Sequence, residues 1–121
     1  MINDNFLVEL AKALAGESYV VPTYLAFGSS VLTESATSTS LSGEFGSRVA
    51  VTDSRALNVV TFNGLRSGAS VSTSAGDTLN GMALFSSSSG GTILTNTALS
   101  SIIHSTAYDI EVDSVITISR P

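Results

Sequence analysis

The hydrophobic period of the chain changes near residue 19, and this change limits the possible folds more than any other feature of the sequence. Up to that point the apolar residues recur every three or four positions, as on one side of an α-helix. Beyond it, apolar and polar residues largely alternate, as they do along strands whose side chains point to opposite faces of a sheet. The alternating stretches predict strands at residues 19–28, 48–52, 57–62, 69–73, 79–85, 93–99 and 106–119, with at most one short further strand around residue 41.

Segments rich in glycine, serine or asparagine separate these stretches and predict the turns between them. Asn63-Gly64 is a strong turn signal directly after a β-branched and aromatic run. Residues 29–46 are expected to form a long polar loop, and the Ser/Gly run at residues 86–91 is expected to be a mobile tip with nothing to pack against. Six to eight short strands, with turn signals about every 8–12 residues, predict an all-β fold, either a β-sandwich or a jelly roll.

Residues 106–119 are the clearest predicted strand. One parity is apolar and is expected to face a core, whereas the other parity carries carboxylates and is expected to face water. The apolar set is Tyr108, Ile110, Val112, Ile116 and Ile118, and the acidic set is Asp109, Glu111 and Asp113. A strand of this length is long enough to be bent or broken near Asp113-Ser114.

Residues 4–15 predict one N-terminal helix. Asn3 or Asp4 can cap its first turn, Lys12 complements the helix dipole in its last turn, and Gly16 supplies a left-handed stop. Its large apolar residues are Phe6, Leu7, Leu10 and Leu14, which we expect to form one stripe. Such a short helix is marginal in isolation, so the stripe is expected to lie on the chain's own sheet or on a neighbouring subunit. We interpret residues 1–16 as an assembly or capping element, these four residues as a candidate interface, and residues 17–121 as the β-sandwich domain.

Composition excludes several classes of protein. The chain has 5 Lys and Arg against 10 Asp and Glu, a net charge of −5, which argues against a nucleic-acid binder that must neutralise phosphates. No apolar run approaches the roughly 20 residues of a membrane helix, and the first residues do not form a secretory signal. Cys is absent, so disulfides and thiolate metal sites are excluded, and the fold must be held by core burial or oligomerisation. We expect synthesis and assembly in a cytoplasm, with no bound nucleic acid, membrane or cofactor.

The residues able to do chemistry do not form a catalytic motif. His104 is the single histidine, and because the chain has 22 serines, a serine near it is expected by chance. No nucleophile-elbow motif is present, so we expect His104 to be a non-catalytic residue at a surface or an interface. Glu34 and Glu44 accompany Arg48 around the long loop, and an ion pair between Glu44 and Arg48, within the chain or across subunits, is a better interpretation than paired-carboxylate catalysis.

The acidic parity of residues 109–113 has two interpretations. Alternate carboxylates about 7 Å apart can share a calcium ion with loop carbonyl oxygens. They can also form a solvated sheet face that prevents edge-to-edge pairing. We expect the solvated face, and therefore no metal site, and leave open whether Asp109, Glu111 and Asp113 bind a cation.

Several segments together resemble one group of proteins. After the N-terminal helix come the stretch PTYLAFG at residues 22–28, the pattern Leu41-x-x-Glu44-x-x-x-Arg48-Val49, the stretch NGMALF at residues 80–85 and the closing strand with Ile110, Val112, Ile116 and Ile118. The chain thereby resembles small virion structural proteins of tailed bacteriophages, of the tail-fibre, baseplate and capsid-decoration kind. The resemblance implies a β-sandwich that assembles as a homo-oligomer and with other virion proteins, without catalytic residues.

The resulting hypothesis is a non-enzymatic structural component of a tailed-phage virion, assembled in the host cytoplasm. Its position in the particle, its copy number and its symmetry stay open. A carbohydrate-binding or receptor-binding β-sandwich module is the alternative, because Tyr19, Tyr24 and Tyr108 can stack a sugar, although Trp is absent. A small hydrolase is a third interpretation and would need a pocket around His104 or Glu44.

Overall fold

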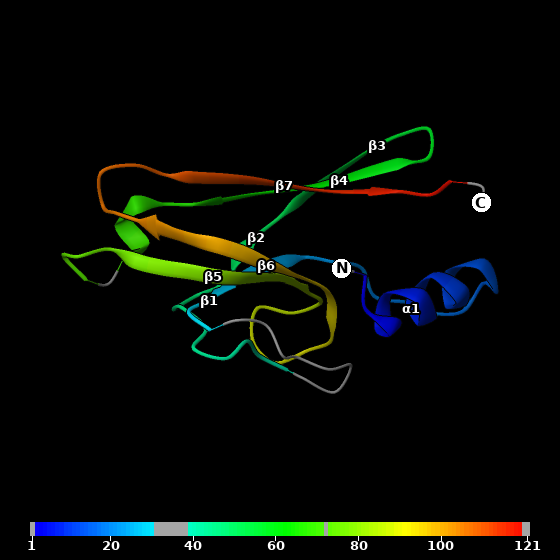
Figure 1. The fold of residues 1–121 in the computed structure, drawn as a ribbon. Helices are drawn as coiled ribbons and strands as arrows, with labels where there is room; N and C mark the ends of the chain where they lie inside the picture. The colour runs from blue at the N-terminus through cyan, green and yellow to red at the C-terminus, as the bar shows by residue number, and fades with distance from the viewer. Residues whose placement is uncertain (1, 31–38, 72, 120–121) are drawn as a thin grey trace.

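The computed structural model describes residues 2–30, 39–71 and 73–119, which form two packed β-sheets with one helix at an end (Figure 1). The elements are α1 (Asp4–Leu14), β1 (Tyr24–Gly28), β2 (Val49–Ala50), β3 (Thr52–Ala56), β4 (Val59–Arg66), the 3-10 turn η1 (Gly68–Ser70), β5 (Asp77–Phe85), β6 (Ile93–His104) and β7 (Ile110–Thr117). One sheet has the strand order β2-β1-β5-β6 and the other has the order β3-β4-β7. All pairings between these strands are antiparallel. The predicted all-β sandwich with a short N-terminal helix is confirmed.

The main core lies between the two sheets. Its buried members come from both layers: Leu25, Phe27, Leu79 and Leu84 from the four-stranded sheet, and Phe62 and Ile116 from the three-stranded sheet. A second cluster, made of Ala26, Leu41, Ala83, Phe85 and Ile93, alternates with Leu25 and Phe27 on β1 and with Leu84 at the end of β5. The two central strands of the larger sheet are therefore covered on both faces, which explains why β1 is buried at four of its five residues.

The predicted register of the last strand is confirmed over β7. Burial alternates along it, with Ile110 and Val112 half-buried and Ile116 buried, whereas Glu111 and Asp113 are exposed. The strand is shorter than predicted and continuous, because it pairs with β4 without interruption from Ile110 to Thr117. Tyr108 and Ile118 lie outside it and are 47% and 53% exposed, so the apolar parity faces the core only within the paired segment.

Two local predictions were wrong. Asn63-Gly64 lies inside β4, and the hairpin between β3 and β4 turns instead at Leu57-Asn58, where Leu57 adopts a φ of 55°. Gly64 is needed there for packing, since a Cβ would come within 3.1 Å of the Leu25 side chain. The predicted strand at residues 69–73 is also absent from the described residues, where the chain forms η1.

Other strands begin or end at different residues than the sequence predicts. β1 begins at Tyr24, five residues later than predicted, and β6 extends five residues further, to His104. Residues 48–52 contribute to two strands, β2 and β3, and β3 continues to Ala56. From residue 39 to residue 48, which the structure describes, the chain forms no strand: Leu41 is buried in the second cluster, and Glu44 forms an isolated bridge with Gly28.

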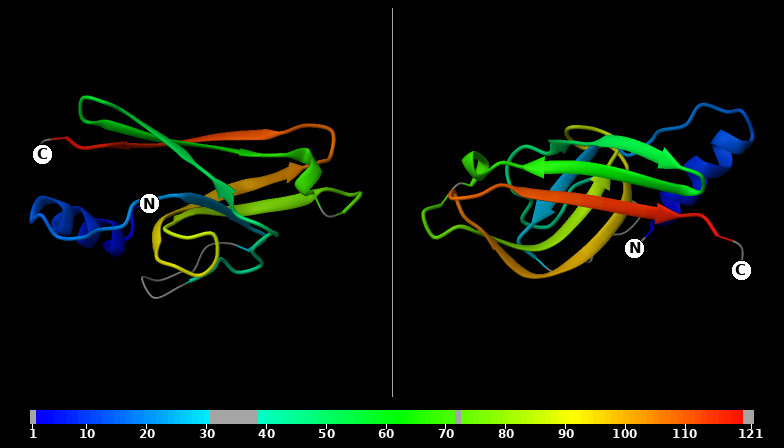
Figure 2. Two further views of the ribbon diagram at one scale, coloured as in Figure 1. Left: turned by 180° about the vertical axis from the view of Figure 1, so that it is seen from behind. Right: turned by 90° about the horizontal axis from the view of Figure 1, so that it is seen from above.

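α1 begins where the sequence predicts and ends at Leu14, one residue earlier than predicted. The Asn3 side chain accepts from the Asn5 N–H, and Gly16 adopts a φ of +74° after the last turn. Asn3 N–H donates to the Leu94 carbonyl at 3.0 Å, and the Asn5 amide donates to the Ile93 carbonyl at 3.1 Å, so the first turn is attached to the start of β6. Its remaining turns extend beyond the sheets (Figures 1 and 2). None of the described helices is long and apolar enough to cross a bilayer.

Candidate functional site

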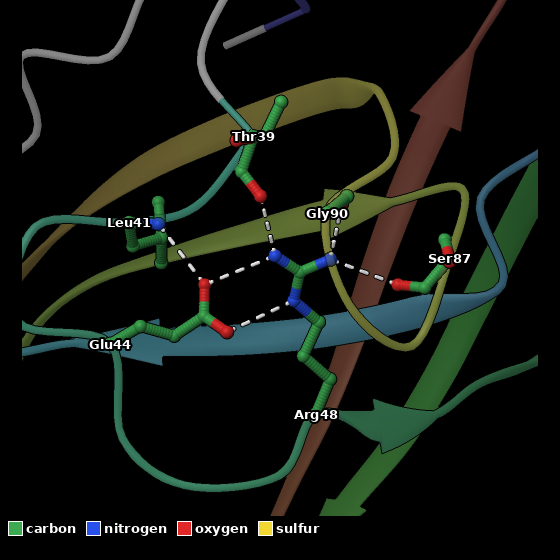
Figure 3. A network of polar contacts seen from close by, with 6 residues as sticks. All are labelled: Thr39, Leu41, Glu44, Arg48, Ser87 and Gly90. Carbon is green, nitrogen blue, oxygen red and sulfur yellow. Dashed lines mark hydrogen bonds and ion pairs between the residues drawn. The ribbon is translucent and has the colours of Figure 1, made fainter.

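Glu44 and Arg48 form the ion pair that the sequence predicts, and they form it within the chain (Figure 3). Arg48 Nε lies 3.0 Å from Glu44 Oε2, and Arg48 Nη2 lies 3.2 Å from Glu44 Oε1. The pairing is bidentate and the Arg48 side chain is only 2% exposed. Glu34, the third residue of the predicted group, lies outside the described residues.

The remaining Arg48 donors bind backbone carbonyls. Nη1 donates to Ser87 at 2.9 Å and to Gly90 at 2.7 Å, and Nη2 donates to Thr39 at 2.8 Å. The guanidinium also lies 3.7 Å from the centroid of the Phe85 ring, over the second apolar cluster. All five N–H groups of Arg48 are thus occupied. The expectation that residues 86–91 have nothing to pack against was wrong: the arginine fastens this turn to the loop at residues 39–48.

Replacing Arg48 by lysine is expected to release that turn. Lysine keeps the charge but has three donors on one nitrogen, so it cannot bind the carboxylate and three carbonyls in one plane. We expect a loss of about 2–4 kcal/mol of unfolding free energy, measured by denaturant titration, and faster hydrogen exchange at residues 86–92. Arg55→Lys is the matched control, because Arg55 is exposed and donates only to the nearby Leu57 carbonyl in the described interactions. Equal effects of the two substitutions would contradict this account of Arg48.

A second polar network joins the two sheets and was missed by the sequence analysis. Arg66 at the end of β4 pairs with Asp77 at the start of β5, with Nη2 2.7 Å from Oδ2. Their side chains are 4% and 2% exposed. Arg66 Nη1 also donates to Nδ1 of His104, the last residue of β6 and the register partner of Asp77. The Arg66 guanidinium therefore links the Asp77 carboxylate and the His104 imidazole in the interior of the protein.

His104 is fully buried, so the expectation of a surface or interface position was wrong. Its Nδ1 accepts from Arg66, and its Nε2 lies 2.8 Å from the Tyr108 carbonyl, which can only accept. This arrangement fixes the neutral imidazole with its proton on Nε2. Both ring nitrogens are occupied by protein groups, and the ring is inaccessible to solvent, so His104 holds the β6–β7 connection together.

The three carboxylates at residues 109–113 do not converge. Asp109 accepts from the Gly68 N–H at 2.8 Å, whereas Glu111 and Asp113 both accept from the Asn63 amide, at 2.8 and 2.7 Å. Across the residues that the structure describes, no group of three or more His, Asp or Glu side chains is close enough to hold a metal ion. Glu111 and Asp113 are both exposed and so lie on a solvated face of the sheet.

The four apolar residues of the predicted interface divide into two pairs on α1. Phe6 and Leu10 are half-buried and line an open groove of about 210 Å³ between the helix, residues 19–22 and the strands β3 and β4. Leu7 and Leu14 lie to the side and are 54% and 83% exposed. No residue of the helix is fully buried. The fold therefore covers one edge of the stripe and leaves the other in solvent.

Glu9 fixes this helix against the chain that returns from it. Its carboxylate accepts from Lys12 Nζ at 2.9 Å and from the Val20 N–H at 2.8 Å. The Lys12 hydrogen bond, followed by that of Val20, holds the pKa of Glu9 below its usual range. The helix and the segment at residues 19–22 thus form one wall of the groove together.

The tyrosines proposed for sugar stacking occupy different places. Tyr19 lines the groove beside α1, and Tyr24 is half-buried at the start of β1. Tyr108 lies in the β6–β7 connection, at the end of the sandwich away from α1 (Figure 1), and its hydroxyl donates to the Ile103 carbonyl. The structure does not assemble the three rings into one platform.

No protein-family model matches the chain, and no curated protein and no solved structure matches it.

Proposed function

We propose that this protein is a non-enzymatic structural component of a tailed-phage virion that assembles with copies of itself and docks to other virion proteins. The observation that carries the proposal is the apolar surface at the α1 end of the molecule. Six large apolar side chains within residues 7–21 are at least 42% exposed: Leu7, Val8, Leu14, Tyr19, Val20 and Val21. A group of this size on a small domain is typical of an interaction site, because exposed apolar patches favour association.

The polar networks support the non-enzymatic part of the proposal. The donors of Arg48 and both nitrogens of His104 are occupied by groups of the same chain. A general acid, general base or anion-binding residue needs an accessible atom to offer to a substrate. These two side chains instead connect strands and loops, which is a structural use.

Replacing Leu7 and Leu14 together by glutamine tests the assembly role of α1. Glutamine retains helix propensity, and both positions are exposed, so the monomer is expected to stay folded. Each leucine buried in a contact contributes roughly 1.5–3 kcal/mol, so the double substitution should raise the self-dissociation constant about a hundredfold or more. Sedimentation velocity and light scattering measure the change.

The matched control is Leu65→Gln, which changes an exposed leucine on β4. It should leave assembly unchanged. Antibodies against the chain should also label purified particles of the phage that encodes it. A wild-type protein that stays a monomer at high concentration and has no affinity for virion proteins would overturn the proposed function.

A further inference from the structure

The three-stranded sheet is one strand narrower than the sheet that it covers. Two strands of the narrower sheet lie over two strands of the wider one. Gly64 of β4 packs on Leu25 of β1, and Ile116 of β7 belongs to the same core cluster as Leu84 of β5. β6 lies beyond β5 in the wider sheet, and in the described residues no strand of the other sheet follows β7. A groove of about 340 Å³ opens there, lined by β5, β6 and β7 and by Ile2 of the N-terminal segment, which forms an isolated bridge with Thr95 of β6. Figure 2 shows β6 passing beneath β7 and beyond its edge.

The groove lies against the edge of the main core, with Met82 and Thr95 half-buried and Thr97 exposed on its floor. Thr95 and Thr97 of β6 line it opposite Ile116 of β7, and Met82 and Leu84 of β5 belong to the main core behind it. Thr97 pairs in register with Met82, and Thr95 pairs with Leu84, so all four side chains point to the same face of the sheet. One further strand beside β7 would cover this face.

The backbone of β7 offers the hydrogen bonds that such a strand needs. Ile118 N–H donates to the Asn58 carbonyl at 2.9 Å, and backbone groups of alternate residues point to opposite sides of a strand. The even-numbered residues of β7 therefore bond to β4. The odd-numbered residues Glu111, Asp113, Val115 and Thr117 direct their N–H and C=O groups to the open edge, and all four are exposed. The β4–β7 register contains no bulge or proline that would block pairing.

Charge and shape indicate which strand fits. Glu111 and Asp113 place two carboxylates on the outer face beside this edge, with one amide, that of Asn63, between them. Lysine or arginine on the outer face of an added strand would complement them. A second copy of β7 fits poorly, because it would bring further carboxylates to this edge.

We infer that the β7 edge and the groove above β6 receive an extended segment of a partner protein. The segment has apolar side chains at alternate positions, which lie over Met82, Thr95 and Thr97. Basic side chains at the intervening positions face Glu111 and Asp113. Its backbone pairs with the four odd-numbered residues of β7. This inference rests on the docking role proposed above and supplies that role with a site separate from α1.

The blocked peptide Ac-VKVKVKVKVK-NH2 serves as the probe, with Ac-VEVEVEVEVE-NH2 as its charge-reversed control. Fluorescence anisotropy should show binding of the lysine peptide at least about tenfold tighter than that of the glutamate peptide. Hydrogen exchange of the wild-type protein should slow on binding at the amides of Glu111, Asp113, Val115 and Thr117. The amides of Val112, Ser114 and Ile116 already face β4 and should change little.

Val115→Pro removes one edge donor and places a ring at the edge, in a position where proline is compatible with the sheet because the N–H faces outward. It should weaken binding of the lysine peptide about tenfold or more, whereas Val115→Thr, which keeps the donor, should not. The exchange pattern provides the same test without a substitution if the proline variant fails to fold.

Binding that survives Val115→Pro but disappears in Glu111→Gln/Asp113→Asn would show charge attraction alone and overturn the inference. Absence of slowed exchange at the odd-numbered amides, or a dimer of the chain formed through β7, would overturn it as well. None of these outcomes alters the expected effect of the Leu7/Leu14 substitutions, so failure at this edge is distinguishable from failure of the proposed function.

Discussion

Asp77→Asn is expected to destabilise the protein by about 3–5 kcal/mol, although it changes a single atom. The substitution leaves the Arg66 guanidinium, which is 4% exposed, without its carboxylate partner at 2.7 Å. Removing one member of a buried ion pair costs more than the pair contributes, because the remaining charge stays buried without compensation. Since the net stability of a domain is about 5–15 kcal/mol, much of it would be lost. Thermal and urea unfolding monitored by circular dichroism measure the effect.

Asp113→Asn is the isosteric control for this prediction. Asp113 is exposed and accepts from the neutral Asn63 amide, so its loss of charge should change stability by less than about 0.5 kcal/mol. The double variant Asp77→Leu/Arg66→Met removes both charges and should be more stable than Asp77→Leu alone. A double variant that loses the sum of the two single losses would show that the pair is not coupled.

The sequence could not predict this network because its members are distant in the chain and each lies at the end of a strand. Arg66, Asp77 and His104 are brought together by the β5–β6 register and by the stacking of β4 on the other sheet. Strand periodicity identifies which residues share a face of one strand, but it does not specify which strands are neighbours or which sheets stack. The Glu44–Arg48 pair was predictable because its spacing is local, whereas its three carbonyl partners depend on loops that periodicity does not describe.

Local signals predicted the fold class well and the turns less well. The cap at Asn3, the stop at Gly16 and the alternation along β7 all depend on chemistry within a few residues, and each is confirmed. The predicted turn at Asn63-Gly64 does not form, because both residues make tertiary contacts within β4. Gly64 leaves room for the Leu25 side chain, and the Asn63 amide donates to two carboxylates of β7. A turn propensity competes with packing, and at this position packing prevails.

The same limit applies to the predicted interface on α1. The spacing of the four apolar residues indicates a stripe, but it does not specify how far the chain's own sheets extend beneath it. Phe6 packs against the main core, whereas Leu14 lies beyond it and remains 83% exposed. Hydrophobic periodicity alone cannot distinguish a helix that caps its own domain from one that binds a neighbour.

The second large expected effect is a loss of stability when a core-facing residue of β7 is made acidic. Ile116→Asp should unfold the protein or cost several kcal/mol, because Ile116 is 8% exposed and contacts the main core, where a carboxylate finds no compensating charge. Aspartate would also lose the apolar contacts of the isoleucine, which contribute roughly 1.5–3 kcal/mol when fully buried. Circular dichroism and denaturant titration should show either loss of the β signal or a large fall in the transition midpoint.

Val115→Asp is the matched control, since it introduces the same charge one residue earlier on the opposite face of the strand. Val115 is 58% exposed, so its carboxylate can remain hydrated and the variant should lose no more than about 1 kcal/mol. The difference between the two variants measures how strongly the register of β7 is specified, because a slip by one residue would exchange the two faces. Similar losses at Ile116 and Val115 would mean that the strand has no preferred face and that the register described here is incorrect.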